Sequence, residues 1–213
     1  MPDLAFEVTG AAAERYAAVP TLSLQLRIEE KTGVRVQAIA LRVQIRIEPQ
    51  LRRYNPEEEE RLYEVFGEAR QWGESLRPFL WTQVATTVGS FSGSTEVSLP
   101  VQCTYDFEVA GAKYLYGVES GEIPLVLLFN GTAFGSGPAG MQVEPIAWHL
   151  EARYRLPISV WRDVLEQYYP NSGWLRLRRD TIDALQHYKV RQALPTWEQA
   201  FESLLKAAGE EPR

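Results

Sequence analysis

Alternation between apolar and polar side chains constrains the fold of this chain more than any other feature of its sequence. Residues 22–28 and 39–47 each carry an apolar side chain at every second position, with polar side chains between them. This two-residue period is typical of strands that bury one face and leave the other in water. Because Lys31, Thr32 and Gly33 lie between the two segments, we predict that they form a β-hairpin.

The same period recurs over residues 82–88 and 97–109 and predicts two more strands. Pro100 interrupts the second of these strands on its polar side. Proline cannot donate a ladder hydrogen bond, so we expect this strand to lie at a sheet edge or to bend there.

The remaining strands give the fold class. Residues 125–129 form a continuous apolar run that predicts a strand covered on both faces. Residues 146–156 predict a last strand with Trp148 pointing inward, and residues 4–8 predict a weak one. About seven strands before residue 158 indicate a mainly β, β-rich α+β chain folded as an immunoglobulin-like antiparallel sandwich. The alternative is a single large antiparallel sheet packed by helices, as in an export chaperone.

Helical signals interrupt and then follow this β domain of residues 1–157. At residues 55–67, Asn55 suits an N-cap and Pro56 a first helical position, and we interpret the acidic run 57–60 as a solvated helix start. Residues 158–207 predict helices packed on the β domain, and residues 208–213 a frayed tail. The last helix opens at Thr196 and is predicted to bury its apolar stripe, namely Trp197, Ala200, Phe201, Leu204 and Leu205.

The composition excludes several classes of partner and cofactor. A net charge of −6 and a pI near 5.1 make binding to nucleic acid through phosphate contacts improbable. No stretch approaches the roughly 20 apolar residues of a membrane span, and no secretory signal opens the chain, so we expect a cytoplasmic protein. One cysteine and two histidines, His149 and His187, are too few for an ordinary zinc site, so we predict neither metal nor cofactor.

The apparent catalytic motifs lack a residue or a neighbouring element that their chemistry requires. Residues 135–140 spell GxGxxG, but no helix pattern follows them, so we predict a glycine-rich hairpin. In residues 89–93, Phe91 occupies the position where a nucleophile elbow needs serine. Asn130-Gly131 is interpreted as a turn or bulge, and Cys103 as a buried core residue. The sequence therefore contains no recognisable catalytic motif, which favours a non-enzymatic function.

The candidate partner site is a segment that concentrates aromatic and basic side chains in an acidic chain. It consists of Tyr169, Trp174, Arg176, Arg178 and Arg179. Aromatic and arginine side chains dominate binding hot spots, so this segment is our first candidate for contact with another protein. The alternative is that Trp174 packs on the sheet while the arginines pair with the acidic run 57–60 or with Asp180.

A second candidate site lies on the polar faces of two predicted strands. It consists of Asp106, Glu108, His149, Glu151 and Arg153, which would line a sheet cleft if the two strands were neighbours. Ion pairs between adjacent strands explain the same charges without a ligand.

Four segments resemble an uncharacterised bacterial family, namely residues 40–49, 77–82, 103–109 and 170–177. The resemblance spans nearly the whole chain. Members of that family are often encoded beside subunits of high-affinity uptake nickel–iron hydrogenases, and no activity or site residues are established for them. The resemblance implies a cellular context and no chemistry.

These observations favour a non-enzymatic accessory or protein-binding module, which the resemblance would connect with a nickel–iron hydrogenase or its maturation. A homo-oligomer is compatible with this expectation. The alternatives are a small-molecule binder or enzyme with a site in the sheet cleft, and a chaperone-like binder of extended segments.

Overall fold

The computed structural model describes residues 2–104, 109–137, 140–172 and 175–210. Its chain divides into two compact units, residues 1–174 and residues 175–213. The first unit holds all the strands and the helices up to residue 168, and the second holds the last two helices. That these last two helices pack on the β domain stays a prediction.

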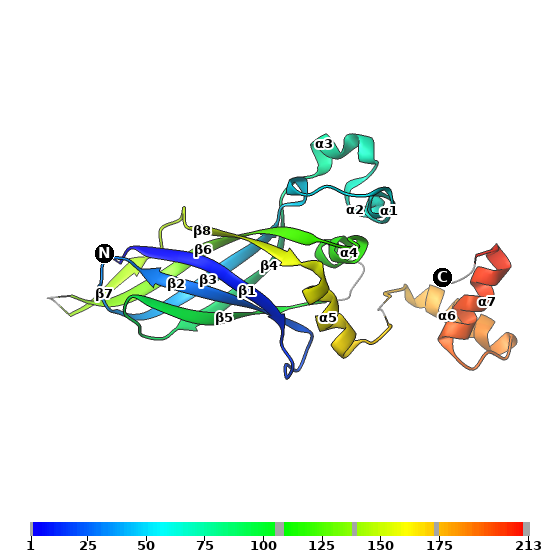
Figure 1. Cartoon of the computed structure of the whole chain (residues 1–213). Helices are drawn as coiled ribbons and strands as arrows, with labels where there is room; N and C mark the ends of the chain where they lie inside the picture. The colour runs from blue at the N-terminus through cyan, green and yellow to red at the C-terminus, as the bar shows by residue number, and fades with distance from the viewer. Residues whose placement is uncertain (1, 105–108, 138–139, 173–174, 211–213) are drawn as a thin grey trace. The chain divides into compact units, whose positions relative to one another are not determined.

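Two antiparallel sheets form the first unit (Figure 1). One sheet has the order β1-β2-β5, with bounds Leu4–Ala13, Thr21–Glu30 and Ser94–Gln102. The other has the order β4-β3-β6-β7, with bounds Phe79–Val88, Val36–Ile47, Glu122–Gly137 and Gly140–Pro145, and β8 (Glu151–Pro157) also pairs with β6. The predicted mainly antiparallel β fold is confirmed. The alternative of a single sheet is wrong.

The apolar faces of both sheets meet in one core. The inward side chains of β2 and β3 are fully buried, as are those of the first half of β6. Phe6 of β1 stacks on Phe129 of β6, with ring centroids 4.1 Å apart, and so joins the two layers. Burial of these alternating side chains is the main stabilising contribution to the fold.

The hairpin predicted for residues 22–47 is wrong. β2 pairs with β1 and β5, whereas β3 pairs with β4 and β6 in the other sheet. The alternating pattern requires only that each apolar face be covered. In the sandwich, the apolar faces of β2 and β3 cover one another across the core, whereas the strands of a hairpin would lie side by side in one sheet.

Other strand predictions have mixed outcomes. β5 lies at the edge of its sheet, as Pro100 predicted. Of the expected strand over residues 146–156, only the part from Glu151 onward is a strand, β8; residues 146–150 connect β7 to β8, and Trp148 lies in this connection, 89% exposed instead of inward. Gly137 pairs with Gly140, which confirms the predicted glycine-rich hairpin.

Asn130-Gly131 forms no turn, because β6 continues through it in register with β3. Gly131 has φ +141°, and a Cβ there would lie 2.0 Å from the carbonyl oxygen of Ala40. Glycine is required at this position by the close approach of the neighbouring strand.

Short helices extend from the sandwich between its strands. After the 3₁₀ turn η1 (Pro49–Leu51), the insertion contains α1 (Pro56–Arg61), α2 (Tyr63–Phe66), η2 (Ala69–Gln71) and α3 (Trp72–Ser75). Asn55 accepts a hydrogen bond from the Glu58 amide in a complete capping box, as its sequence predicted. α4 (Ala110–Gly117) was not predicted, whereas α5 (Ile158–Tyr168) lies where the helical period begins and packs against β1, β2 and β8.

The second unit is a pair of helices, α6 (Arg179–Arg191) and α7 (Trp197–Ala208). Thr196 caps α7 by accepting a hydrogen bond from the Gln199 amide, as expected. No helix among the described residues is long and apolar enough to cross a membrane.

Candidate functional site

The arginines of the first candidate site are displayed on the surface. Arg176, Arg178 and Arg179 are exposed, and Leu175 beside them is 62% exposed. Arg178 forms an ion pair with Asp180, one of the two pairings expected from the sequence. This pair lowers the pKa of Asp180 below its usual range.

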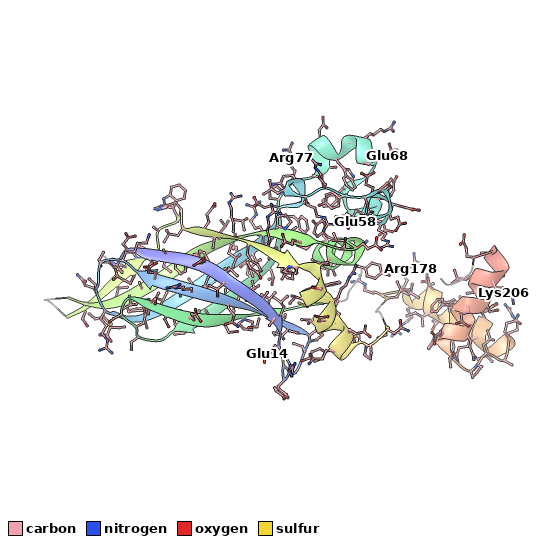
Figure 2. All side chains as sticks on the ribbon, viewed as in Figure 1. Glu14, Glu58, Glu68, Arg77, Arg178 and Lys206 are labelled. Carbon is pink, nitrogen blue, oxygen red and sulfur yellow. The ribbon has the colours of Figure 1, made fainter. Side chains whose placement is uncertain are left out.

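The aromatic member of this candidate site that the structure describes, Tyr169, belongs to a different unit from the arginines. Tyr169 is half-buried at the end of α5 and belongs to the first unit, whereas the three arginines belong to the second. Trp174 lies outside the described residues. The structure therefore describes the arginines as one exposed group at the start of α6, and Figure 2 labels Arg178 within it.

Helix α7 of the second unit exposes apolar side chains that were expected to be buried. Only Ala200 is buried on α7, while Trp197 and Leu205 are each 42% exposed and Leu204 is 36% exposed. These three side chains are not buried within the second unit, and their burial against the β domain stays a prediction. The apolar stripe of α7 is too broad for one neighbouring helix to cover within this unit.

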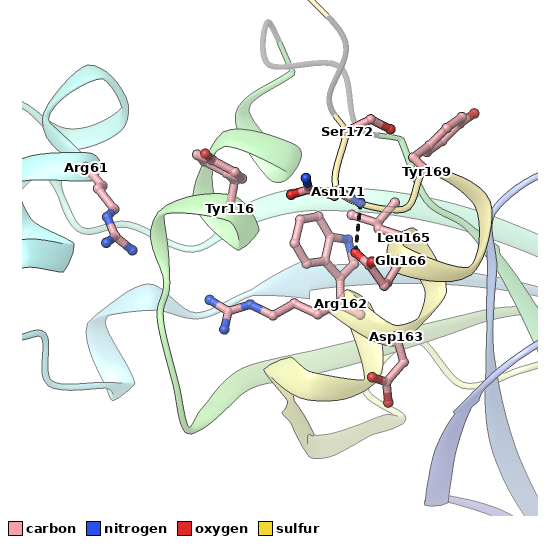
Figure 3. A pocket seen from close by; sticks show the side chains of 10 residues that line it. Arg61, Tyr116, Arg162, Asp163, Leu165, Glu166, Tyr169, Asn171 and Ser172 are labelled. Carbon is pink, nitrogen blue, oxygen red and sulfur yellow. Dashed lines mark hydrogen bonds between the residues drawn. The ribbon is translucent and has the colours of Figure 1, made fainter. Parts of the chain in front are cut away.

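An open cavity of 730 Å³ lies beside α5 in the first unit. Arg61 of α1 and Arg162 of α5 reach toward it from opposite sides, with Tyr116 of α4 between them (Figure 3). Arg162 also donates a hydrogen bond to the Val118 carbonyl at 2.7 Å, which ties α5 to the end of α4. Two guanidinium groups at one cavity can attract a carboxylate or phosphate.

Of the predicted site residues that the structure describes, Tyr169 alone lines this cavity. Sequence reasoning missed Arg61 and Arg162 because they are about a hundred positions apart, and no local pattern joins α1 to α5. The tertiary fold alone brings them to one cavity.

The second candidate site is not a cleft in the described structure. Arg153 pairs with Glu48 at 3.2 Å and with Glu151 at 3.3 Å; Arg153 and Glu151 are exposed on β8, whereas Glu48 follows β3 and is mostly buried. His149 is exposed in the turn before β8, edge-on to Trp148. Asp106 and Glu108 lie outside the described residues. Glu151 and Arg153 thus form an ion pair with one another, and His149 is shown in contact with neither of them.

The acidic run of the insertion is solvated only in part. Glu58 is 1% exposed, and its carboxylate accepts hydrogen bonds from Arg52 at 2.5 Å and from the Glu119 amide at 2.8 Å. Burial alone would raise the pKa of Glu58, but these donors, with the Asn55 amide, lower it overall. The prediction of a wholly solvated run is wrong, because the capping box turns Glu58 inward.

A hydrogen-bonded aromatic cluster lies next to this ion pair. The Tyr54 hydroxyl lies 2.9 Å from the Tyr114 hydroxyl and donates to the Pro49 carbonyl at 2.8 Å. Burial raises the pKa of Tyr114 to about 12, so both hydroxyls stay protonated near neutrality. The cluster joins the insertion to α4, which is a structural role.

Cys103 is a buried core residue, as predicted. Burial raises the pKa of its thiol to about 12, which leaves almost no thiolate near neutral pH. Among the described residues, no group of three or more histidine, cysteine, aspartate or glutamate side chains could hold a metal ion.

Comparison with known proteins gives a family and distant structural likenesses. The model of DUF6084, a family of unknown function, matches residues 1–213. A search of the curated proteins finds no match.

Solved structures resemble the chain only weakly. A late embryogenesis abundant protein is 12% identical, with a TM-score of 0.36, 74% of this chain covered and 72% of that protein. A CARDB domain from Pyrococcus furiosus is 9% identical, with a TM-score of 0.28 and coverage of 73% and 87%. A β-glucosidase from Kluyveromyces marxianus is 7% identical, with a TM-score of 0.28, and 72% of this chain matches only 15% of that enzyme.

Proposed function

For a chain that belongs to DUF6084, a family of unknown function, we propose a non-enzymatic accessory role in which it binds another protein. The observation that carries the proposal is the exposed group formed by Leu175, Arg176, Arg178 and Arg179. This group lies at the start of α6 and is the part of the chain most enriched in arginine.

The physical argument rests on charge and geometry. Three arginines within four positions make a basic patch in a chain whose net charge is −6. Arg178 has a carboxylate partner in Asp180, whereas no ion pair of Arg176 or Arg179 is found among the described residues. Guanidinium groups bind carboxylates in bidentate geometry, so the expected partner presents an acidic surface.

The family resemblance suggests where to look for that partner. The subunits of a nickel–iron hydrogenase, or the proteins that mature it, are the first candidates. Affinity capture of the tagged chain from its native host, followed by mass spectrometry, would identify the partner directly.

A charge-reversal experiment tests the proposed surface. We expect the double variant Arg176→Glu, Arg179→Glu to lose the captured partner, because both exposed cations become anions. Arg155→Glu is the matched control, since Arg155 is an exposed arginine on β8. Equal recovery of the partner by wild type and by a folded double variant would refute this surface.

A further inference from the structure

The second unit buries too little to be stable as an isolated pair of helices. α6 and α7 meet through the Tyr188 and Ser203 hydroxyls, which are 2.8 Å apart, and the Lys189 ammonium lies 5.7 Å from the Trp197 ring centre. Within residues 175–210, Ala200 is the only residue classed as buried. Units of this size need a further apolar surface to form a core.

The apolar side chains of α7 are arranged evenly about its middle. Trp197, Phe201 and Leu205 follow one another at four-residue intervals and therefore share one face of the helix. Phe201 lies halfway between the other two. A second α7 that ran antiparallel and crossed at Phe201 would place its Leu205 against Trp197, and its Trp197 against Leu205.

The charges of α7 are divided along the helix. Glu198 and Glu202 precede Lys206. The start of α6 is mixed instead, because Arg179 stands beside Asp180 there. Antiparallel pairing of two α7 helices brings Glu198 of each copy toward Lys206 of the other, so the charges of this helix are complementary to themselves.

We propose that α6 and α7 form a self-association element whose occupant is the same helical pair of a second copy of this chain. Two such pairs related by a two-fold axis make a four-helix bundle, in which each apolar stripe covers the other. This inference does not depend on the proposed partner of the arginine group.

The mass of the full-length chain in solution tests the proposal first. Sedimentation equilibrium and light scattering are expected to show a dimer that dissociates on dilution. A wild-type chain that is monomeric at all concentrations would overturn the proposal, and would favour cover by the chain's own sandwich or by a different protein.

Variants then locate the interface. Trp197→Glu and Leu205→Glu are each expected to raise the dissociation constant at least tenfold, because each places two carboxylates in the apolar contact. Met141→Glu is the matched control, since Met141 is an exposed apolar residue on β7. Equal dimer affinity in all three variants would refute this interface.

Exchanging the charges of α7 distinguishes antiparallel two-fold pairing from nonspecific association. Glu198→Lys and Lys206→Glu are each expected to weaken the dimer severalfold by setting like charges opposite one another. Mixing the two single variants should yield a heterodimer that is stronger than either homodimer, and the double variant should regain wild-type affinity. Failure of both rescues, with the helical circular dichroism unchanged, would show that the α7 helices do not pair antiparallel.

Discussion

The Arg52 guanidinium donates a hydrogen bond to the Glu58 carboxylate at 2.5 Å, with both side chains almost completely removed from solvent. Glu58 also accepts from backbone amides of Asn55 and Glu119, so one buried carboxylate links α1 to the segment after α4. The Nε and Nη1 atoms of Arg52 are buried without a partner in the described structure. The pair therefore fixes the geometry of the insertion at an energetic cost.

Removing one partner of this pair should be strongly destabilising. We expect Arg52→Leu to lower the free energy of unfolding by about 3–5 kcal/mol, because it leaves the buried Glu58 carboxylate without its counter-charge. Urea denaturation followed by tryptophan fluorescence measures the change. The double variant Arg52→Leu, Glu58→Gln should be less destabilised than the sum of the single changes, and strict additivity would contradict the coupling.

Acid should destabilise the fold through Glu58 and Glu30. Both carboxyls have pKa values below their ordinary value of 4.5, because hydrogen bonds outweigh the cost of burial. Their contribution is fully present above the unfolded pKa and is lost as the pH falls through the lower, folded pKa. The urea concentration at the midpoint of unfolding should therefore decrease as the pH is lowered below about 4.5. This decrease should be smaller in the variant Glu58→Gln. An identical pH profile for the variant would exclude Glu58 as a cause.

Gly131 should not tolerate a side chain. We expect Gly131→Ala to reduce the stability by about 2 kcal/mol or more, since its Cβ would collide with the Ala40 carbonyl and φ is positive. Gly135→Ala on the same strand is the control, because its nearest neighbour, the Arg35 carbonyl oxygen, is 4.0 Å away. Thermal unfolding of both variants should show a large loss for the first and little change for the second.

The Cys103 thiol should be unreactive in the folded chain. Its raised pKa and its burial leave neither thiolate nor access for an alkylating reagent. Mass spectrometry after brief iodoacetamide treatment should find no adduct in buffer and complete modification in urea. Rapid labelling of the native chain would contradict the core assignment.

Two tryptophans should differ sharply in their importance for stability. Trp161 is 2% exposed on α5, so Trp161→Ala is expected to cost about 3–5 kcal/mol. Trp148 is 89% exposed, and Trp148→Ala should change the stability by less than about 0.5 kcal/mol. Chemical denaturation compares the two, and equal losses would show that Trp148 has apolar contacts.

The sequence by itself determined the local structure of this protein. Alternation located most of its strands, Asn55 and Thr196 marked two helix starts, and Pro100 marked an edge strand. These features depend on neighbouring residues: a side-chain period, a cap or a missing N–H group acts within a few positions.

Only the tertiary structure decided how these elements combine. The alternation of β2 and β3 demands a cover for each apolar face and does not specify which strand provides it, so the predicted hairpin was wrong. The hydrogen bond from the Glu119 amide to Glu58, and the lining of one cavity by both Arg61 and Arg162, join distant positions and leave no mark in a local pattern. The apolar stripe of α7 shows the same limit, because amphipathic spacing identifies a face that needs cover, while the surfaces near it in space determine its burial.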